Sequence, residues 1–222
     1  MRHRAGRITG PFPLADGQFV WLRQVRAEDA PRLVELCQRL SPLSMWRRFL
    51  RSTARCDPQE AERLASVDQV REVAVAAIPD PHADSPILAV GRFHGDGSDR
   101  AELAVVVDDA YQRLGLGRLL LQWVVQEAAR RGLRTLDGYV LYDNQPMLRL
   151  LRSSGHPLEV KWDNGDLLTI KLDVRPPVGQ GPIRRLLPSV CPWPRRPGTV
   201  AARPGGQRRG RRAVVQARAA SL

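Results

Sequence analysis

The chain has 222 residues, enough for one domain of ordinary size with a remainder. Its formal net charge is +12, but eleven arginines between residues 175 and 222, a stretch without lysine or acid, supply nearly all of it. The rest of the chain is close to neutral, so composition excludes a folded body that is itself a nucleic-acid-binding surface. No stretch approaches the roughly 20 apolar residues of a membrane span, and the N-terminus lacks the apolar run of a signal peptide. We expect a cytoplasmic protein.

The sequence offers no metal-binding pattern. Cys37, Cys56 and Cys191 are odd in number and widely spaced, with no C-x-x-C pair, which is typical of reduced, incidental cysteines. His82 and His94 fall on or beside turns, without a partner His or Cys at ligand spacing. We therefore predict no metal site.

The N-terminal part predicts a short lead-in, a strand and a helix. Residues 1–17 contain glycine and proline without periodicity and are expected to be loose. Residues 18–25 alternate as a strand does, and residues 30–40 carry a helical apolar stripe with Asp29 as a plausible N-cap.

The next segment predicts another helix and two strands. Asp57 and Pro58 resemble a capped helix start, and that helix would run to about Ala65. Residues 70–78 and 87–94 are expected to be strands parted by a proline-rich turn, which predicts an antiparallel meander.

The centre of the chain joins a strand to a helix through a glycine loop. A β-branched strand at 100–108 leads into the loop 112–117, and a helical segment follows that Gly132 would end. The first amides of a helix have no internal partners and carry its positive dipole end, so they favour an anion. Gly115 and Gly117 lack the side chains that would keep a pyrophosphate from the main chain.

The C-terminal half of the domain completes a crossover and a hairpin. A strand at 133–141 follows the central helix, and such a strand-helix-strand unit makes the two strands parallel. Residues 143–151 begin a short helix that ends near Gly155. Residues 159–162 and 167–172 flank an Asn-Gly pair, which is a strong hairpin signal.

The glycine loop matches one family and not two others. A P-loop needs a Lys followed by Ser or Thr after its last glycine, and a dinucleotide fingerprint needs a small residue where Leu120 stands. Gln112, Gly115 and Gly117 after a valine-rich strand instead resemble the Q-x-x-G-x-G loop of the GNAT N-acetyltransferase superfamily. The short helix with its N-x-x-M pattern from Asn144 is a second resemblance at the expected distance.

The resemblance covers residues 18–174 and implies an α/β (α+β) fold. That fold is a mixed, mostly antiparallel central sheet of about seven strands, flanked by helices and with splayed central strands. The resemblance also implies acetyl-CoA as co-substrate, bound by main-chain groups in the splay and by the loop. The implied cofactor-binding residues are Val105, Val106, Val107, Gln112, Arg113, Leu114, Gly115, Leu116, Gly117, Arg118 and Asn144. Asn144 has an equally good interpretation as a helix N-terminal cap.

The implied reaction is attack of an amine on a thioester, which needs a base to take a proton from the ammonium. Several protein lysine acetyltransferases of the family carry a catalytic glutamate where Glu102 stands. Many members also have a tyrosine, as general acid for the leaving thiolate, where this chain has Leu151. Either Tyr142 or water protonates the thiolate, or it leaves unprotonated, because a thiol is a tolerable leaving group near neutral pH.

Three hypotheses for the acceptor stay open. The L-S-P-x-S segment with the Arg48-Phe49 pair looks most like bacterial protein lysine acetyltransferases acting on acyl-CoA synthetases. Trp46 and Phe49 are candidates for the acceptor entrance, or for packing. A small amine such as a polyamine or aminoglycoside is the first alternative, with Asp163 and Asp166 as candidate acidic groups. A non-catalytic acyl-CoA-binding module is the second.

The tail, residues 175–222, is rich in Pro, Gly and Arg, which disfavours packing and predicts disorder. Its arginine runs could give weak, salt-sensitive, nonspecific nucleic-acid contact. The alternative is a solubilising extension without a specific partner.

Overall fold

The computed structural model describes residues 8–50, 57–82 and 84–175. The expectations for the tail, for Cys56 and for Cys191 lie outside these residues. The strands are β1 (Thr9–Pro13), β2 (Phe19–Gln24), β3 (Glu72–Ile78), β4 (Ala89–Gly95), β5 (Arg100–Val107), β6 (Thr135–Leu141), β7 (Leu158–Asn164) and β8 (Leu167–Asp173). The α-helices are α1 (Ala30–Arg39), α2 (Pro42–Phe49), α3 (Pro58–Ala65), α4 (Leu116–Arg130) and α5 (Gln145–Arg152), with short 3-10 turns at Ala27–Asp29 and Asp109–Tyr111.

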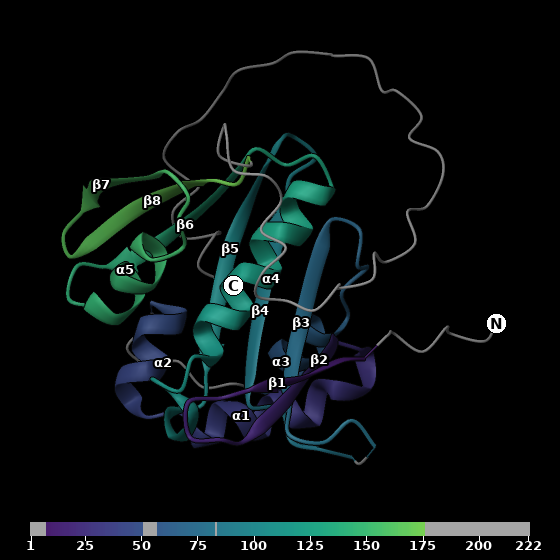
Figure 1. Ribbon diagram of the computed structural model, residues 1–222. Helices are drawn as coiled ribbons and strands as arrows, with labels where there is room; N and C mark the ends of the chain where they lie inside the picture. The colour runs from purple at the N-terminus through teal and green to yellow at the C-terminus, as the bar shows by residue number, and fades with distance from the viewer. Residues whose placement is uncertain (1–7, 51–56, 83, 176–222) are drawn as a thin grey trace.

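All eight strands form one sheet in the order β1-β2-β3-β4-β5-β6-β8-β7. Neighbouring strands are antiparallel except β5 and β6, which α4 connects as a parallel crossover. Figure 1 shows α4 lying over β4 and β5, with α5 beside the β6, β7 and β8 group and with α1, α2 and α3 at the other side. The mixed, mostly antiparallel sheet and the parallel pair expected from the sequence are confirmed.

Two elements were not expected. Residues 9–13 form β1, the edge strand paired with β2, so the segment predicted as a loose lead-in supplies an eighth strand. Residues 42–49 form α2 in the stretch for which no helix was predicted. Ser41 caps it, because its hydroxyl accepts the amide of Ser44 at 3.2 Å and Pro42 stands in the first turn.

Two apolar cores hold the helices to the sheet. One lies between the sheet and α4 and α5, and its fully buried side chains include Leu120, Leu136 and Leu151. The other lies between the sheet and α1, α2 and α3. Gly91 lets α4 come close to β4, because a Cβ there would lie only 3.0 Å from a methyl of Val124.

Asp29 precedes α1 as expected, but its side chain does not cap the helix. Its carboxylate accepts from Arg23 at 2.6 and 2.7 Å and from the amide of Arg26 at 2.9 Å, and it also pairs with Arg32. Burial acts to raise the pKa of Asp29. The hydrogen bond from Arg23, the amide of Arg26 and the two positive charges outweigh it and hold the pKa below its ordinary 3.8.

We expect Asp29→Asn to lower the free energy of unfolding by about 3–5 kcal/mol at neutral pH, because it leaves the Arg23 guanidinium buried without its counter-charge. The native pKa of Asp29 is below the unfolded one, so this contribution is complete above the unfolded value and is lost as pH falls through the native value. Urea unfolding between about pH 2 and pH 7 measures both effects.

Asp84→Asn is the matched control, because Asp84 also pairs with Arg32 but is 96 % exposed. Its removal should cost no more than about 1 kcal/mol. Equal losses for the two variants would contradict the role given to burial.

Candidate active site

The central strands separate part of the way along the sheet. In the described residues, β5 pairs with β6 at only three positions, and the last of them joins Glu102 to Asp137. On its other edge β5 stays paired with β4 as far as Val107. In Figure 1, β6, β8 and β7 diverge from β5 on the side where α2 lies. On the edge toward β6, the stretch from Val105 to Val107 therefore faces the splay rather than a neighbouring strand.

The loop after β5 delivers the helix amides to the same place. Gly115 has a φ of +93°, a left-handed conformation that glycine adopts without cost, and it is the N-terminal cap of α4. The amide of Leu119 donates to the carbonyl of Gly115 at 3.1 Å, so the amides of Leu116, Gly117 and Arg118 precede the first helical hydrogen bond. They are positioned to receive an anion.

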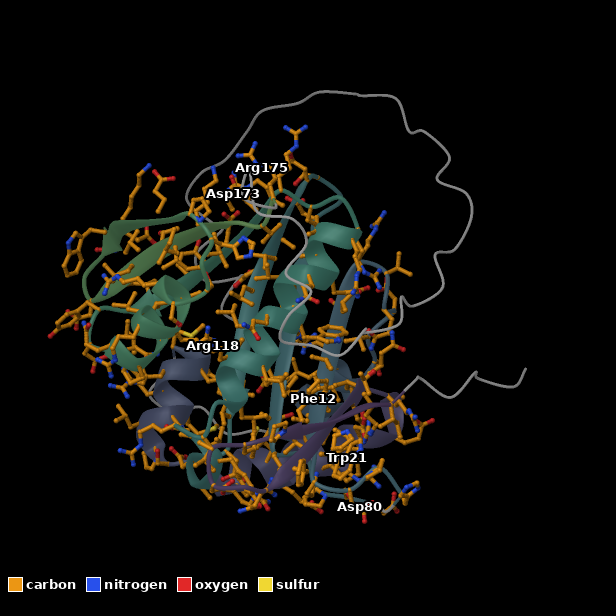
Figure 2. All side chains as sticks on the ribbon, viewed as in Figure 1. Phe12, Trp21, Asp80, Arg118, Asp173 and Arg175 are labelled. Carbon is orange, nitrogen blue, oxygen red and sulfur yellow. The ribbon has the colours of Figure 1, made fainter. Side chains whose placement is uncertain are left out.

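Two arginines, Arg113 and Arg118, flank the glycines of this loop. Arg113 takes a positive φ of 63°, so the strained backbone of the loop is not confined to glycine. Arg118 is exposed, and Figure 2 shows it beside the first turn of α4 on the side toward α5. A Cβ at Gly117 would lie 3.4 Å from Leu150, so the glycine leaves a shallow space between α4 and α5.

The unexpected β1 segment supports the loop. The amide of Ala15, just after β1, donates to the carbonyl of Leu114 at 3.0 Å. This contact fixes the residue that precedes Gly115. The sequence did not predict this contact, because Gly and Pro hide the strand pattern of residues 9–13 that leads to Ala15.

Asp109 ties the loop to α2. Its carboxylate accepts the amide of Ser41 at 2.6 Å, the hydroxyl of Ser44 at 2.6 Å and the side-chain amide of Gln112 at 3.0 Å. Gln112 also lies 3.3 Å from the carbonyl of Val107. The side chain of Gln112, expected at the entrance of the loop, thus fastens the loop to β5 and α2.

The other end of α2 reaches the opposite side of the splay. Arg47 donates to the carbonyl of Asp143 at 3.2 Å, and Asp143 directly follows the β6 strand and Tyr142. Asp108, next to Asp109, is buried and pairs with Arg39 at the end of α1 at 2.6 Å. The helix α2 therefore spans from the β5 side to the β6 side.

The candidates beyond β6 have structural contacts of their own. The side-chain oxygen of Asn144 accepts a hydrogen bond from the amide of Met147 at 3.2 Å, as expected of a residue that caps the N-terminus of α5. Tyr142 is 47 % exposed, and its ring packs against Trp162 with centroids 6.0 Å apart. Leu151 is fully buried in the α4 and α5 core, so the position where many family members have tyrosine is a packing position here.

Glu102 lies on the last paired rung, on the face of β5 that also carries Val106. Its register neighbours are His94 on β4 and Asp137 on β6. Arg100 holds Asp137 through a contact of 2.6 Å, and the positive charge of Arg48 on α2 attracts Glu102. Glu102 is half-buried. Glu102, Val105 to Val107 and the amides of the first turn of α4 thus follow one another along the splay, from its inner end outward.

The two aromatic candidates of α2 differ. Phe49 is buried in the second core, whereas Trp46 is 36 % exposed. Asp163 and Asp166 are exposed on the β7–β8 hairpin at the sheet edge. Of these four residues, only Trp46 combines an exposed aromatic ring with a place on the helix that spans the splay.

A groove of about 490 Å³ lies beside the first β5–β6 pair, Arg100 with Thr135, at the end of the paired stretch away from the splay. Its charged lining includes Arg100, Arg134, Glu159, Lys171, Asp173 and Arg175. Figure 2 shows Asp173 and Arg175 at the end of the sheet away from Arg118. Among the described residues there is no grouping of three or more His, Cys, Asp or Glu that could hold a metal ion, and no helix long and apolar enough to cross a membrane.

Known proteins share both the sequence and this architecture. The family model described as "Acetyltransferase (GNAT) family" matches residues 46–156. The chain is 29 % identical to Acetyltransferase Pat of Mycolicibacterium smegmatis over 185 residues, which are 82 % of this chain and 54 % of that protein. It is also 29 % identical to Acetyltransferase PA5475 of Pseudomonas aeruginosa over 124 residues, 55 % of this chain and 67 % of that one.

The crystal structure of the GNAT domain of S. lividans PAT superposes with a TM-score of 0.65 at 25 % identity, covering 76 % of this chain and 96 % of that one. The chain thus spans about half the length of the Pat protein but nearly all of an isolated GNAT domain. With the splayed strands and the glycine loop in place, the chain belongs to the GNAT family of acetyl-CoA-dependent acyltransferases.

Proposed function

We propose that this domain transfers the acetyl group of acetyl-CoA to the side-chain amine of a protein lysine, with Glu102 as general base. The observation that carries the proposal is the end of β5–β6 pairing at Glu102 and Asp137. It puts a carboxylate at the inner end of the splay, while the first turn of α4 lies at the outer end.

The residues fit the co-substrate. The left-handed Gly115 turns the amides of Leu116 to Arg118 outward, where they suit a pyrophosphate. The main chain of Val105 to Val107 suits an extended amide-bearing arm, which would add to β5 as a strand does. Acetyl-CoA supplies a thioester whose carbonyl carbon an amine can attack.

The place of Glu102 at the inner end of the splay supports its role as base. A lysine ammonium has no lone pair at neutral pH, so a carboxylate must take its proton, directly or through water. Arg48 on α2 interacts electrostatically with Glu102, whose carboxylate form is the form that accepts a proton. A main-chain N–H near Val105 would stabilise the oxyanion of the tetrahedral intermediate.

Solvent is the better candidate for protonating the leaving thiolate. The ring of Tyr142 packs against Trp162 of the edge strand, and Leu151 is buried in the core. The thiolate itself is a tolerable leaving group near neutral pH. Tyr142 stays a candidate that substitution can test, as does Asn144, whose side chain already caps α5.

A polypeptide acceptor has room on the side of Glu102 away from the splay. The charged groove at Arg100, two residues from Glu102 along β5, offers room for residues that flank a lysine, whereas a small amine would not need it. The likeness to Pat and to the PAT GNAT domain points in the same direction. The cytoplasmic location and the nucleic-acid contact of the tail stay predictions.

Gly115→Val should weaken coenzyme A binding by at least tenfold, about 1.4 kcal/mol, because valine resists a positive φ and the amides would turn away from the anion. Gly97→Val is a matched control. Gly97 has φ +94° against +93° for Gly115, and a Cβ at either glycine would meet nothing within 4 Å. Calorimetric titration with coenzyme A should separate the two variants, although both should lose similar stability. Equal affinities of the two variants for coenzyme A would contradict the assignment of the loop to the binding site.

Glu102→Gln should lower kcat/KM by about 100-fold or more between about pH 6 and pH 9, because an amide cannot act as a base. Binding of acetyl-CoA should not change. The measurement is release of the coenzyme A thiol with lysine-bearing proteins and peptides, and in parallel with polyamines and aminoglycosides. Glu62→Gln, an exposed change on α3, is the control.

Equal activity of the Glu102 variant across that pH range would refute the base assignment. Turnover with small amines but not with lysine-bearing proteins or peptides would favour a small amine as the acceptor. Tight acetyl-CoA binding without thiol release for any acceptor would favour the binding module.

A further inference from the structure

A small cavity lies between α1, α2 and the sheet, close to the inner part of the splay. Its volume is about 30 Å³, and its walls include Leu36, Leu40, Val90 and Val106. A cavity needs roughly 10–15 Å³ on this measure to hold a water molecule, so it can take a group of two or three heavy atoms. The lining is apolar except for Cys37 and two guanidinium groups, those of Arg48 and Arg92.

Arg48 is the unusual member of this lining. Within residues 8–50, 57–82 and 84–175, no hydrogen bond or ion pair engages its guanidinium; its recorded contact is with the ring of Phe49, 5.0 Å from the centroid. Arg48 is partly exposed, and its guanidinium carries five N–H donors in a fork that matches a carboxylate, so it can receive such a group from a ligand.

The second guanidinium adds to the positive potential of the cavity. Arg92 is buried, and it reaches the carbonyl of Leu64 at 3.4 Å and Glu72 at 3.6 Å, both long contacts. Burial lowers the pKa of Arg48 to about 10, and repulsion by Arg92 acts in the same direction, whereas Cys37, Glu102 and Glu60 oppose it. Both groups remain cationic at neutral pH.

The cavity adjoins the place where the acyl group would lie. The side chain of Val106 forms part of its wall, and the main chain of the neighbouring Val105 and Val107 faces the splay. An acyl group held beside Val106 therefore has this cavity within reach of its far end. That placement rests on the function proposed above.

We propose that the cavity is a subsite for an acyl chain that ends in a carboxylate, such as the malonyl or succinyl group, which Arg48 binds with support from Arg92. The carboxylate matches the planar fork of a guanidinium, and the apolar walls strengthen such a charge-assisted pair. The shortest such chain, malonyl, adds to acetyl only the three heavy atoms of a carboxylate.

The chemistry is the same as for acetyl transfer. The amine nitrogen forms a bond to the thioester carbonyl carbon, the carbon–sulfur bond breaks, and the electron pair leaves with the coenzyme A sulfur. Glu102 takes the proton of the ammonium, and solvent protonates the thiolate. The distal carboxylate is unchanged, so no further reactant is needed.

The test is calorimetric titration of the full chain with malonyl-CoA and isovaleryl-CoA, with acetyl-CoA as reference. Isovaleryl has the shape of malonyl without its charge. We expect the wild-type chain to bind malonyl-CoA at least about tenfold tighter than isovaleryl-CoA, in line with a charge-assisted hydrogen bond. Arg48→Met should reduce that ratio to near one and leave acetyl-CoA affinity within about twofold. Arg71→Met, an exposed change, controls for the lost charge.

Val90→Leu tests the cavity without changing any charge. The larger side chain should fill the space and remove the malonyl preference while acetyl-CoA still binds. A wild-type ratio near one, or an equal loss of all three ligands in Arg48→Met, would overturn the subsite. Failure of the wild-type chain to bind acetyl-CoA would instead count against the proposed function itself.

Discussion

The site depends on one interruption in the hydrogen bonding of the sheet. Parallel pairing of β5 and β6 stops at Glu102 and Asp137, although both strands continue for several residues. Buried main-chain N–H and C=O groups must find partners, so a sheet opens in this way only where water or a ligand can replace the missing strand. An extended arm rich in amides satisfies that requirement better than a compact ligand does. The open edge of β5 therefore sets both the shape and the polarity of what can bind.

Polar contacts between distant residues keep the opening in place. Asp109 fastens the start of α2 to the end of β5, and Arg47 fastens the end of α2 near the end of β6. Because α2 is attached on both sides, it fixes the width of the splay more firmly than the apolar cores alone could. The same helix carries Arg48 inward and Trp46 outward, so one element joins the acyl side of the site to its entrance.

Local patterns in the sequence predicted most of this fold, and nonlocal contacts account for what they missed. The Asp57 cap, the central crossover and the Asn-Gly hairpin depend on neighbouring residues, and the structure has all three. β1 depends on pairing with β2 and contains Gly and Pro, so no alternation marks it. Asp109 and Ser41 are 68 positions apart, and only the folded chain shows that Asp109 anchors α2 while Asp108 anchors the end of α1. The place of Arg48 in the lining of the cavity likewise follows from how α2 lies against the sheet.

The order of residues along β5 constrains how the proton can travel. Strand residues advance about 3.3 Å each, so the three steps from Glu102 to Val105 separate their main chains by roughly 10 Å. A glutamate side chain covers only part of that distance, and an amine attacking a thioester near Val105 would lie beyond direct reach of the carboxylate. A water between them closes the gap, and the half-buried position of Glu102 leaves room for one. Proton transfer through water also explains how a carboxylate fixed by the last paired rung can serve amines that enter at slightly different depths.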